Sequence, residues 1–160
     1  MTNSETDTLY MTKAIVLAEK GMKKGEGGPF GAIIVKNNKI IGQGWNQVLK
    51  TNDPTAHAEI VAIRNACTNL DTYWLEGCTL YVNCEPCPMC MSAIYWAHIE
   101  KICFGATRKD AATIGFDDEH IYNEICKEPN KRKLKIITKL RQEALHVMHQ
   151  WPQLTTRQDY

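Results

Sequence analysis

Four residues in two short segments of this chain carry the side chains of a hydrolytic metal site. His57 and Glu59 lie in the sequence Pro-Thr-Ala-His-Ala-Glu, and Cys87 and Cys90 lie in Pro-Cys-Pro-Met-Cys. One imidazole and two thiolates can hold Zn²⁺ and leave its fourth position open to water, whose pKa the metal lowers. A carboxylate two residues from the histidine is placed to move protons. The sequence therefore predicts zinc-assisted hydrolysis, with His57, Cys87 and Cys90 as ligands and Glu59 as the catalytic acid and base.

The spacing of these residues predicts that both segments begin helices. Residues two apart on a regular helix point in different directions, so His57 and Glu59 converge only at the first turn of a helix. Pro86 and Pro88 favour a helix that starts near Cys87, where free N–H groups and the helix dipole stabilise thiolates. We therefore expect two helix N-termini to face one metal ion.

Cys84 leaves a second arrangement of the metal site open. Together with His57, Cys87 and Cys90 it could complete a closed Cys₃His structural site that admits no water. The residues before it, Tyr81-Val82-Asn83, are typical of a strand that ends at Cys84. Because a small buried thiol is the usual role of a cysteine at such a place, the open site is the favoured interpretation.

Length and charge limit the class of protein. The chain has 160 residues, and its 19 lysines and arginines against 18 aspartates and glutamates give a net charge of +1. One domain spanning residues 1–160 is the natural organisation for this length, with a loose N-terminal tail at residues 1–7. A nearly neutral chain is atypical of nucleic-acid-binding proteins, which usually carry a basic face. A small-molecule substrate is therefore favoured over a nucleic acid.

The sequence lacks the signals of membrane and secreted proteins. No apolar run is long enough to span a bilayer, and no signal peptide precedes the first predicted helix. Seven cysteines in such a chain indicate reduced thiols rather than a disulfide framework. These features predict a cytoplasmic protein that does not associate with membranes.

The hydrophobic pattern predicts alternating helices and strands around the metal-binding segments. Asn37-Asn38 tolerate the positive φ of a tight hairpin between two β-branched segments. Residues 134–140 predict a fifth strand. The fold class is therefore expected to be α/β, a three-layer α/β/α arrangement with a mixed five-stranded sheet. In order, the predicted elements are helix 8–24, strands 30–35 and 39–44, helix 57–70, strand 79–84, helix 88–98, strands 101–107 and 134–140, and a closing helix from residue 142.

Longer blocks of the sequence resemble the bacterial-type guanine deaminases of the cytidine deaminase superfamily, whose signature pairs H-x-E with P-C-x-x-C. The resemblance implies the cytidine deaminase-like fold and a Zn²⁺ cofactor. It also implies hydrolytic deamination of guanine to xanthine and ammonia, a reaction of purine salvage or catabolism. The blocks that carry the resemblance are Gly27 to Ala32, Asn52 to Glu59, Cys84 to Cys90, Ala93 to Ala97 and Gly115 to Asp118.

The resemblance implies roles for four residues outside the metal site. In such enzymes Asn46 would hydrogen-bond the purine, Phe30 and Trp96 would lie around the base, and Asp118 would recognise its polar edge. From the residues alone, the asparagine also fits a turn, the aromatic residues fit core packing, and the aspartate fits a helix cap. In the implied reaction a zinc-bound hydroxide attacks C2 of the purine, and Glu59 shuttles protons.

A homodimer is a further implication of the resemblance. Guanine deaminases of this type can exchange a C-terminal segment between subunits, here residues 142–160, so that Tyr160 would complete the active site of the other subunit. Deamination of guanosine and deamination of adenosine in tRNA are alternative activities, because the scaffold serves many substrates. A non-catalytic zinc module is a third alternative, which Glu59 opposes.

Overall fold

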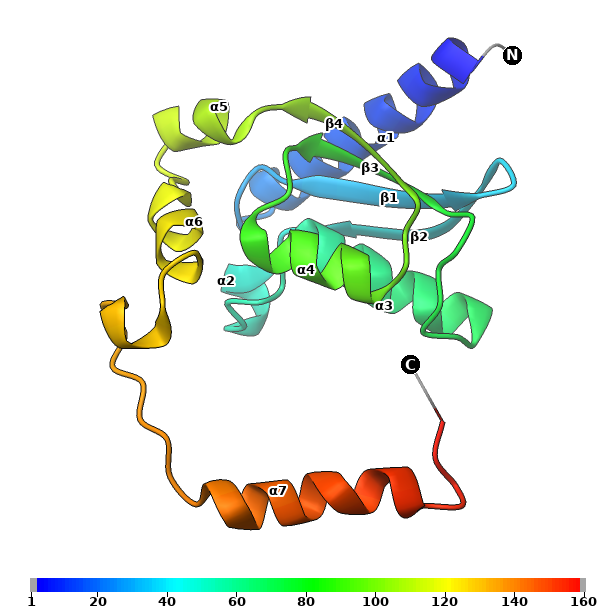
Figure 1. Ribbon diagram of the computed structural model, residues 1–160. Helices are drawn as coiled ribbons and strands as arrows, with labels where there is room; N and C mark the ends of the chain where they lie inside the picture. The colour runs from blue at the N-terminus through cyan, green and yellow to red at the C-terminus, as the bar shows by residue number, and fades with distance from the viewer. Residues whose placement is uncertain (1–2, 159–160) are drawn as a thin grey trace. The chain divides into compact units, whose positions relative to one another are not determined.

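The computed structural model describes residues 3–158 of the chain (Figure 1). Its contacts divide the chain into two units, Met1–Asp118 and Glu119–Tyr160, and each unit is described by itself. The elements are α1 Asn3–Lys23, β1 Gly31–Lys36, β2 Lys39–Trp45, α2 Val48–Thr51, α3 Ala58–Leu70, β3 Thr79–Cys84, α4 Pro88–Trp96, β4 Lys101–Ala106, α5 Arg108–Thr113, α6 Glu119–Ile125 and α7 Arg141–Gln150, with 3₁₀ turns at Pro129–Lys131 and Trp151–Gln153.

A mixed sheet in the order β2-β1-β3-β4 forms the centre of the first unit. β1 pairs antiparallel with both β2 and β3, whereas β3 and β4 are parallel. The turn between β1 and β2 contains Asn37 and Asn38 with φ values of 49° and 60°, which confirms the predicted hairpin. Parallel strands need a crossover connection, and α4 provides it between β3 and β4.

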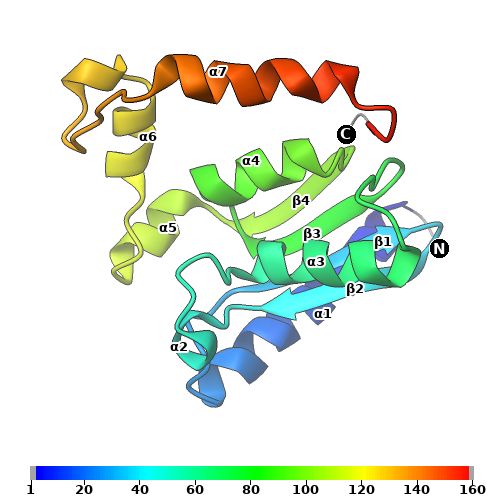
Figure 2. The same ribbon diagram turned by 90° about the horizontal axis from the view of Figure 1, so that it is seen from below.

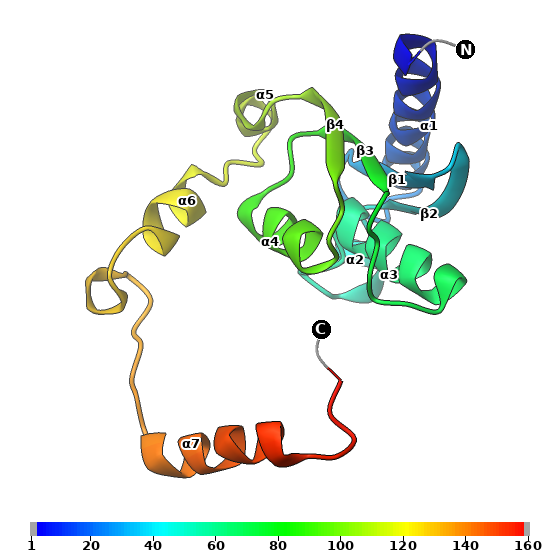
Figure 3. The same ribbon diagram turned by 45° about the vertical axis from the view of Figure 1, so that its right-hand side comes forward.

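Helices cover both faces of this sheet, α1 on one face and α3 with α4 on the other (Figures 2 and 3). Successive side chains of a strand point to opposite faces, and β1 shows the consequence clearly. Ile33 and Val35 pack in one apolar cluster with residues of α1. Ala32 and Ile34 belong to the other cluster, with residues of α3 and α4. A strand buried on both faces explains why this segment is almost wholly apolar.

Small residues bring α3 unusually close to β2. A Cβ atom added to Gly44 would lie 2.6 Å from the carbonyl oxygen of Ala58 and 2.8 Å from the amide nitrogen of Ala62. The helix backbone therefore occupies the space that a side chain would otherwise fill. This contact fixes the first turn of α3, the turn that follows His57 and contains Glu59.

The start of α1 differs from the sequence prediction. Helix α1 begins at Asn3, so residues 3–7 are helical and do not form the loose tail expected there. The Asp7 carboxylate accepts a hydrogen bond of 2.6 Å from the Tyr81 hydroxyl. It also forms an ion pair with Lys101, with 2.9 Å between Oδ2 and Nζ. These contacts join the first turns of α1 to β3 and β4. These contacts join residues distant in sequence, so the local spacing of apolar residues could not predict them.

The fifth strand predicted at residues 134–140 is wrong. Within residues 3–158 the sheet has four strands, and 134–140 is not one of them. Leu134 and Leu140, at the ends of this segment, are 74% and 71% exposed. The consecutive β-branched residues Ile136, Ile137 and Thr138 favour an extended chain. A strand forms only where it pairs with a neighbour, and none is present for this segment among the described residues. The closing helix, α7, begins at Arg141, one residue before its predicted start.

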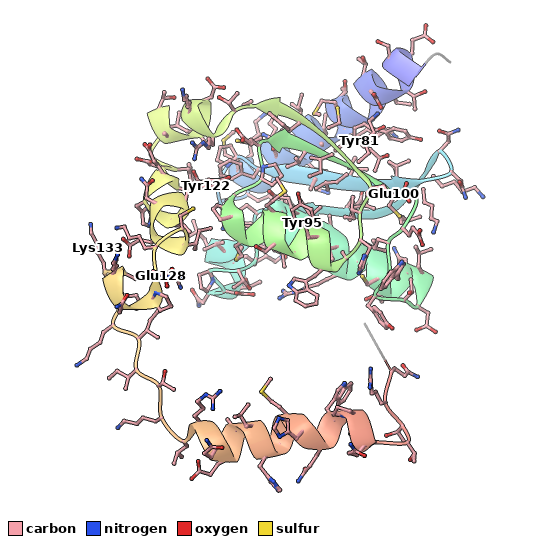
Figure 4. All side chains as sticks on the ribbon, in the orientation of Figure 1. Tyr81, Tyr95, Glu100, Tyr122, Glu128 and Lys133 are labelled. Atoms are coloured by element: carbon pink, nitrogen blue, oxygen red, sulfur yellow. The ribbon has the colours of Figure 1, made fainter. Side chains whose placement is uncertain are left out.

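The second unit leaves many large apolar side chains in contact with solvent. Neither α6 nor α7 contains a buried residue. Figure 4 shows the side chains of this unit, with Tyr122 labelled on α6 and Glu128 and Lys133 on the segment after it. Exposed apolar surface of this extent is typical of an interaction surface. The exposed large apolar residues are Ile121, Ile125, Leu134, Ile136, Ile137, Leu140, Val147, Met148, Trp151 and Leu154.

Two further sequence predictions concern membranes and disulfides. Among the helices of residues 3–158, none combines the length and the apolar character that a bilayer crossing needs. All seven cysteines of the chain lie in this part and are free thiols.

Candidate metal centre

His57, Cys87 and Cys90 converge at one point of the first unit. The Nδ1 atom of His57 lies 3.6 Å from Sγ of Cys87 and 3.5 Å from Sγ of Cys90. All three donor atoms lie within 4.8 Å of one another, and Cys90 is fully buried. One nitrogen and two sulfur donors are the ligand set of a catalytic zinc site that keeps a position open.

Two helix N-termini bring these donors together, as the spacing predicts. His57 is the N-cap of α3, with φ −68° and ψ 158°, and Cys87 is the N-cap of α4, with φ −67° and ψ 169°. Pro88 occupies the first position of α4, where its missing N–H costs no hydrogen bond. Glu59 and Cys90 follow within the first turns of the two helices. The prediction of two facing helix starts is confirmed.

Hydrogen bonding among the donor groups favours a thiolate. The Cys90 thiol donates to Cys87, and this hydrogen bond, with a smaller one from His57, lowers the pKa of Cys87 to about 4. The same contact raises the pKa of Cys90, and hydrogen bonding to Cys87 raises the pKa of His57. The cluster therefore concentrates negative charge on sulfur, which suits a cation whose ligands give up their protons on binding.

Glu59 is a buried carboxyl group beside the donor cluster. The residue is 6% exposed, and burial raises the pKa of its carboxyl group to about 6, although a hydrogen bond from its own backbone N–H opposes the shift. It does not belong to the group of donor atoms that could hold the metal among the described residues. A carboxyl group next to a metal ligand, without being a ligand, is placed for proton transfer.

Cys84 is engaged outside the donor cluster. Its thiol donates to the carbonyl oxygen of Thr107 at 3.7 Å, and burial raises its pKa to about 11. The group of possible metal ligands found among residues 3–158 does not include it. The arrangement therefore favours the open three-ligand site over the closed Cys₃His alternative.

Asn46 lies directly after β2 and is 4% exposed. Its Oδ1 atom accepts a hydrogen bond of 3.2 Å from the backbone N–H of Val48, and its own N–H donates to the carbonyl oxygen of Phe30 at 2.9 Å. A Cβ atom on Gly27 would lie 2.0 Å from Oδ1, so only glycine fits there. Because Oδ1 is engaged by the backbone, the side chain offers Nδ2 as a hydrogen-bond donor.

Phe30 packs against a second aromatic residue that the sequence analysis missed. The rings of Phe30 and Phe116 meet edge to face, with centroids 4.9 Å apart and an interplanar angle of 89°. A Cβ atom on Gly28 would lie 2.8 Å from Phe116 and 2.9 Å from Phe30, so the loop passes close to both rings. The signal available was the position of Phe116 within the block Gly115 to Asp118.

Asp118 lies close enough to the metal ligands to respond to their charge. The residue is half-buried, and its pKa is raised first by burial and then by the negative charge of Cys87. Arg108 opposes this shift. The influence of the Cys87 charge indicates that Asp118 lies near the donor cluster.

Trp96 lies at the opposite end of α4 from Cys87. It is the last residue of α4, whereas Cys87 precedes the first, and nine helical residues rise about 13 Å along the axis. Trp96 is 70% exposed and its neighbour Tyr95, labelled in Figure 4, is 75% exposed. Tyr160 lies outside the described residues.

The fold and the donor set define a zinc-dependent deaminase domain. Residues 4–106 match the family described as the cytidine and deoxycytidylate deaminase zinc-binding region. This match covers the sheet and all three candidate ligands. The chain therefore belongs to the cytidine and deoxycytidylate deaminase family.

Within this family, the chain is similar to guanine deaminases and to tRNA-specific adenosine deaminases. The guanine deaminase of Bacillus subtilis is 45% identical over 158 residues, which cover 99% of each chain. The X-ray structure of the B. subtilis guanine deaminase superimposes with a TM-score of 0.93 at 43% identity and covers 100% of this chain and 99% of that one. The tRNA-specific adenosine deaminase of Buchnera aphidicola is 43% identical over 82% of this chain and 85% of its own length.

Proposed function

We propose that this chain is a zinc-dependent guanine deaminase that converts guanine and water to xanthine and ammonia. The observation that carries this conclusion is the similarity to a guanine deaminase, which runs through both units of the chain. The metal-donor group and the buried Glu59 supply the chemistry that such a reaction needs.

Catalysis combines a metal with one buried carboxyl group. The nitrogen and two sulfurs of His57, Cys87 and Cys90 fit Zn²⁺, and the bound ion supplies Lewis acidity that activates water at the open position. Glu59 accepts a proton as the C2–O bond forms and delivers it to the adjacent ring nitrogen. The same carboxyl group then takes the remaining proton of the new C2 hydroxyl and gives it to the exocyclic amine, so that the C2 carbonyl forms while the C2–N bond breaks. Ammonia leaves and xanthine remains.

We assign three groups of the first unit to the recognition of guanine. Guanine has acceptors at O6, N3 and N7 and donors at N1 and the exocyclic amine. The Nδ2 donor of Asn46 suits an acceptor of the ring, and the Asp118 carboxylate suits a donor. The Phe30–Phe116 pair offers an aromatic face for the base. This arrangement must direct C2, rather than C6, toward the metal.

Isotope labelling tests the reaction directly. Purified protein loaded with zinc is incubated with guanine in H₂¹⁸O, and the product is analysed by mass spectrometry. Hydrolytic attack at C2 predicts xanthine with one heavy oxygen and one equivalent of ammonia. Recovery of unchanged guanine would reject the proposed function.

The tRNA adenosine deaminases supply a second candidate function. Their similarity to most of the chain favours it, since the B. aphidicola enzyme is 43% identical. The net charge of +1 opposes it, because an anticodon loop needs a basic surface. Guanosine is a related alternative that differs from guanine only at N9. A comparison of the rates of ammonia release from guanine, guanosine and an anticodon stem-loop distinguishes the three activities.

The proposal includes a two-fold homodimer in which residues 142–160 are exchanged and Tyr160 reaches the active site of the other subunit. Support comes from the apolar side chains that the second unit leaves exposed, including Val147 and Met148 on α7. Support also comes from the exposed Tyr95 and Trp96 on α4 of the first unit. A second copy of the chain would cover such surfaces, as in most symmetric oligomers.

A further inference from the structure

We propose that Asn83 is a positioning residue for substrate binding, because its side-chain amide holds the loop that orients both Phe30 and Asn46. The inference rests on the proposed function, since these two residues are assigned there to the purine. Asn83 itself lies on β3, next to the strand's last residue, Cys84.

The amide of Asn83 continues the sheet at the point where strand pairing stops. The β1–β3 ladder pairs Ala32 with Val82, and Asn83 follows on β3. Its Oδ1 atom accepts a hydrogen bond of 2.8 Å from the N–H of Gly31, and its Nδ2 atom donates one of 2.9 Å to the carbonyl oxygen of Pro29. One side chain thus binds the backbone on both sides of Phe30.

The held segment is also the backbone anchor of Asn46. The carbonyl oxygen of Phe30 accepts the N–H of Asn46 at 2.9 Å, and the N–H of Phe30 donates to Gly28 at 2.8 Å. A shift of residues 29–31 therefore moves the Phe30 ring and the Asn46 backbone together. Both groups contact the base in the ground state and the transition state alike, so their displacement weakens substrate binding more than turnover.

Substitutions of Asn83 can distinguish a role in substrate binding from a role in the stability of the fold. Aspartate at this position keeps an acceptor for Gly31 but loses the donor to Pro29 and places a carboxylate beside that carbonyl oxygen. The four β1–β3 residue pairs from Ala32 to Val35 do not involve Asn83. We therefore expect the sheet to form in Asn83→Asp and in the truncated variant Asn83→Ala.

Asn69 provides a matched control. Its Nδ2 atom donates to the carbonyl oxygen of Ile41 at 2.8 Å, so it also joins a side-chain amide to the backbone of a strand. This contact links α3 to β2 and involves neither residues 29–31 nor Asn46. Asn69→Asp should alter stability without altering substrate affinity.

The experiment is a double-mutant cycle between Asn83→Asp and Asn46→Ala, read in kcat and KM for guanine, zinc content and thermal unfolding. We expect Asn83→Asp to raise KM about tenfold, to change kcat less than about threefold and to leave the zinc content unchanged. In the Asn46→Ala background the increase in KM should be clearly smaller, since coupled residues are not additive. A normal KM in both Asn83 variants, or full additivity with Asn46→Ala, would overturn the role.

Hydrogen exchange gives an outcome that does not depend on catalysis. The amide proton of Asn46, bonded to Phe30, should exchange faster in Asn83→Asp and Asn83→Ala and at the wild-type rate in Asn69→Asp. Unchanged protection in the Asn83 variants would reject the positioning role even if the wild-type protein deaminates guanine. If the wild-type protein does not deaminate guanine while protection of Asn46 falls as expected, the proposed function fails and the structural link stands.

Discussion

Two carboxyl groups near the donor cluster differ in burial, and this difference suits the different roles proposed for them. Glu59 is 6% exposed and lies beside Cys90, so it can exchange protons in a site shielded from bulk water. Asp118 is half-buried and lies within range of the Cys87 charge. A partly exposed carboxyl group suits the substrate recognition proposed for Asp118, and a buried one suits the proton transfer proposed for Glu59.

Substitution of Glu59 by glutamine should abolish most turnover and preserve the metal centre. The amide is nearly isosteric but cannot carry a proton, so kcat should fall by about two to four orders of magnitude. Steady-state assays, zinc analysis and thermal unfolding of the same preparation provide the comparison. Turnover within a few-fold of the wild type would remove Glu59 from the mechanism.

Substitution of Asp118 by alanine should impair guanine recognition selectively. Loss of a hydrogen bond to a charged group costs about 2–3 kcal/mol, which corresponds to a decrease of roughly 30- to 150-fold in kcat/KM. Zinc content and the unfolding temperature should change little, because Asp118 does not supply a metal donor. Asp117→Ala is the matched control and should have the smaller effect; equal effects would move recognition elsewhere.

Among the elements of the fold, two helix starts form the candidate metal centre. Helices α3 and α4 each present a ligand at their N-cap, and both pack on the face of the sheet opposite α1. α1 closes the other face, and its first turns are joined to the sheet through Asp7. The contribution of Asp7 to the stability of the fold can be measured without an activity assay.

The contacts of Asp7 should make the stability of the folded protein depend on pH. The hydrogen bond from Tyr81, followed by that from Lys101, lowers the pKa of Asp7 below its ordinary value of 3.8. A carboxyl group with a lowered pKa in the folded state stabilises the protein above the unfolded-state value, and this stabilisation is lost as the pH falls through the folded-state pKa. Asp7→Asn should therefore unfold at a lower temperature than the wild type at pH 7, and the difference should shrink below about pH 4.

Thermal unfolding at pH 7, 5 and 3 measures this dependence. Glu143→Gln on α7 also removes one carboxyl group and serves as the control for overall charge. A difference between wild type and Asp7→Asn that persists unchanged at pH 3 would show that Asp7 acts through packing rather than through its charge.

Local patterns in the sequence predicted the candidate metal donors and most elements, because each depends on residues near one another in the chain. The motif around His57 specified a helix start, and Thr79–Cys84 was predicted with its observed bounds. The strand predicted at residues 134–140 failed because pairing requires a distant partner that its own pattern does not contain. Asn83 and Phe116 were missed for the same reason, since their contacts with residues 28–31 join segments far apart in sequence.

At the scale of the whole molecule, two inactive variants should restore activity to each other if the C-terminal segment is exchanged. One variant is Glu59→Gln with its C-terminal segment intact, and the other lacks residues 158–160 but retains Glu59. In a mixed dimer one site combines an intact Glu59 with the segment from the other subunit. Random pairing makes half of the dimers mixed, so about a quarter of all sites should recover.

Mass spectrometry of the co-expressed protein must confirm that mixed dimers form. Activity no higher than the average of the two variants, with mixed dimers present, would argue against exchange. A truncated chain with full activity on its own would show that residues 158–160 are not required for catalysis.

Ammonia release by the purified, zinc-loaded protein tests the proposed function most directly. The substrates are guanine, guanosine, adenine, cytosine and an anticodon stem-loop at equal concentrations. We expect guanine to react fastest, chelation of zinc to abolish the reaction and added zinc to restore it. Faster release from the stem-loop than from guanine, or release from guanine that persists after complete removal of zinc, would contradict the proposed function.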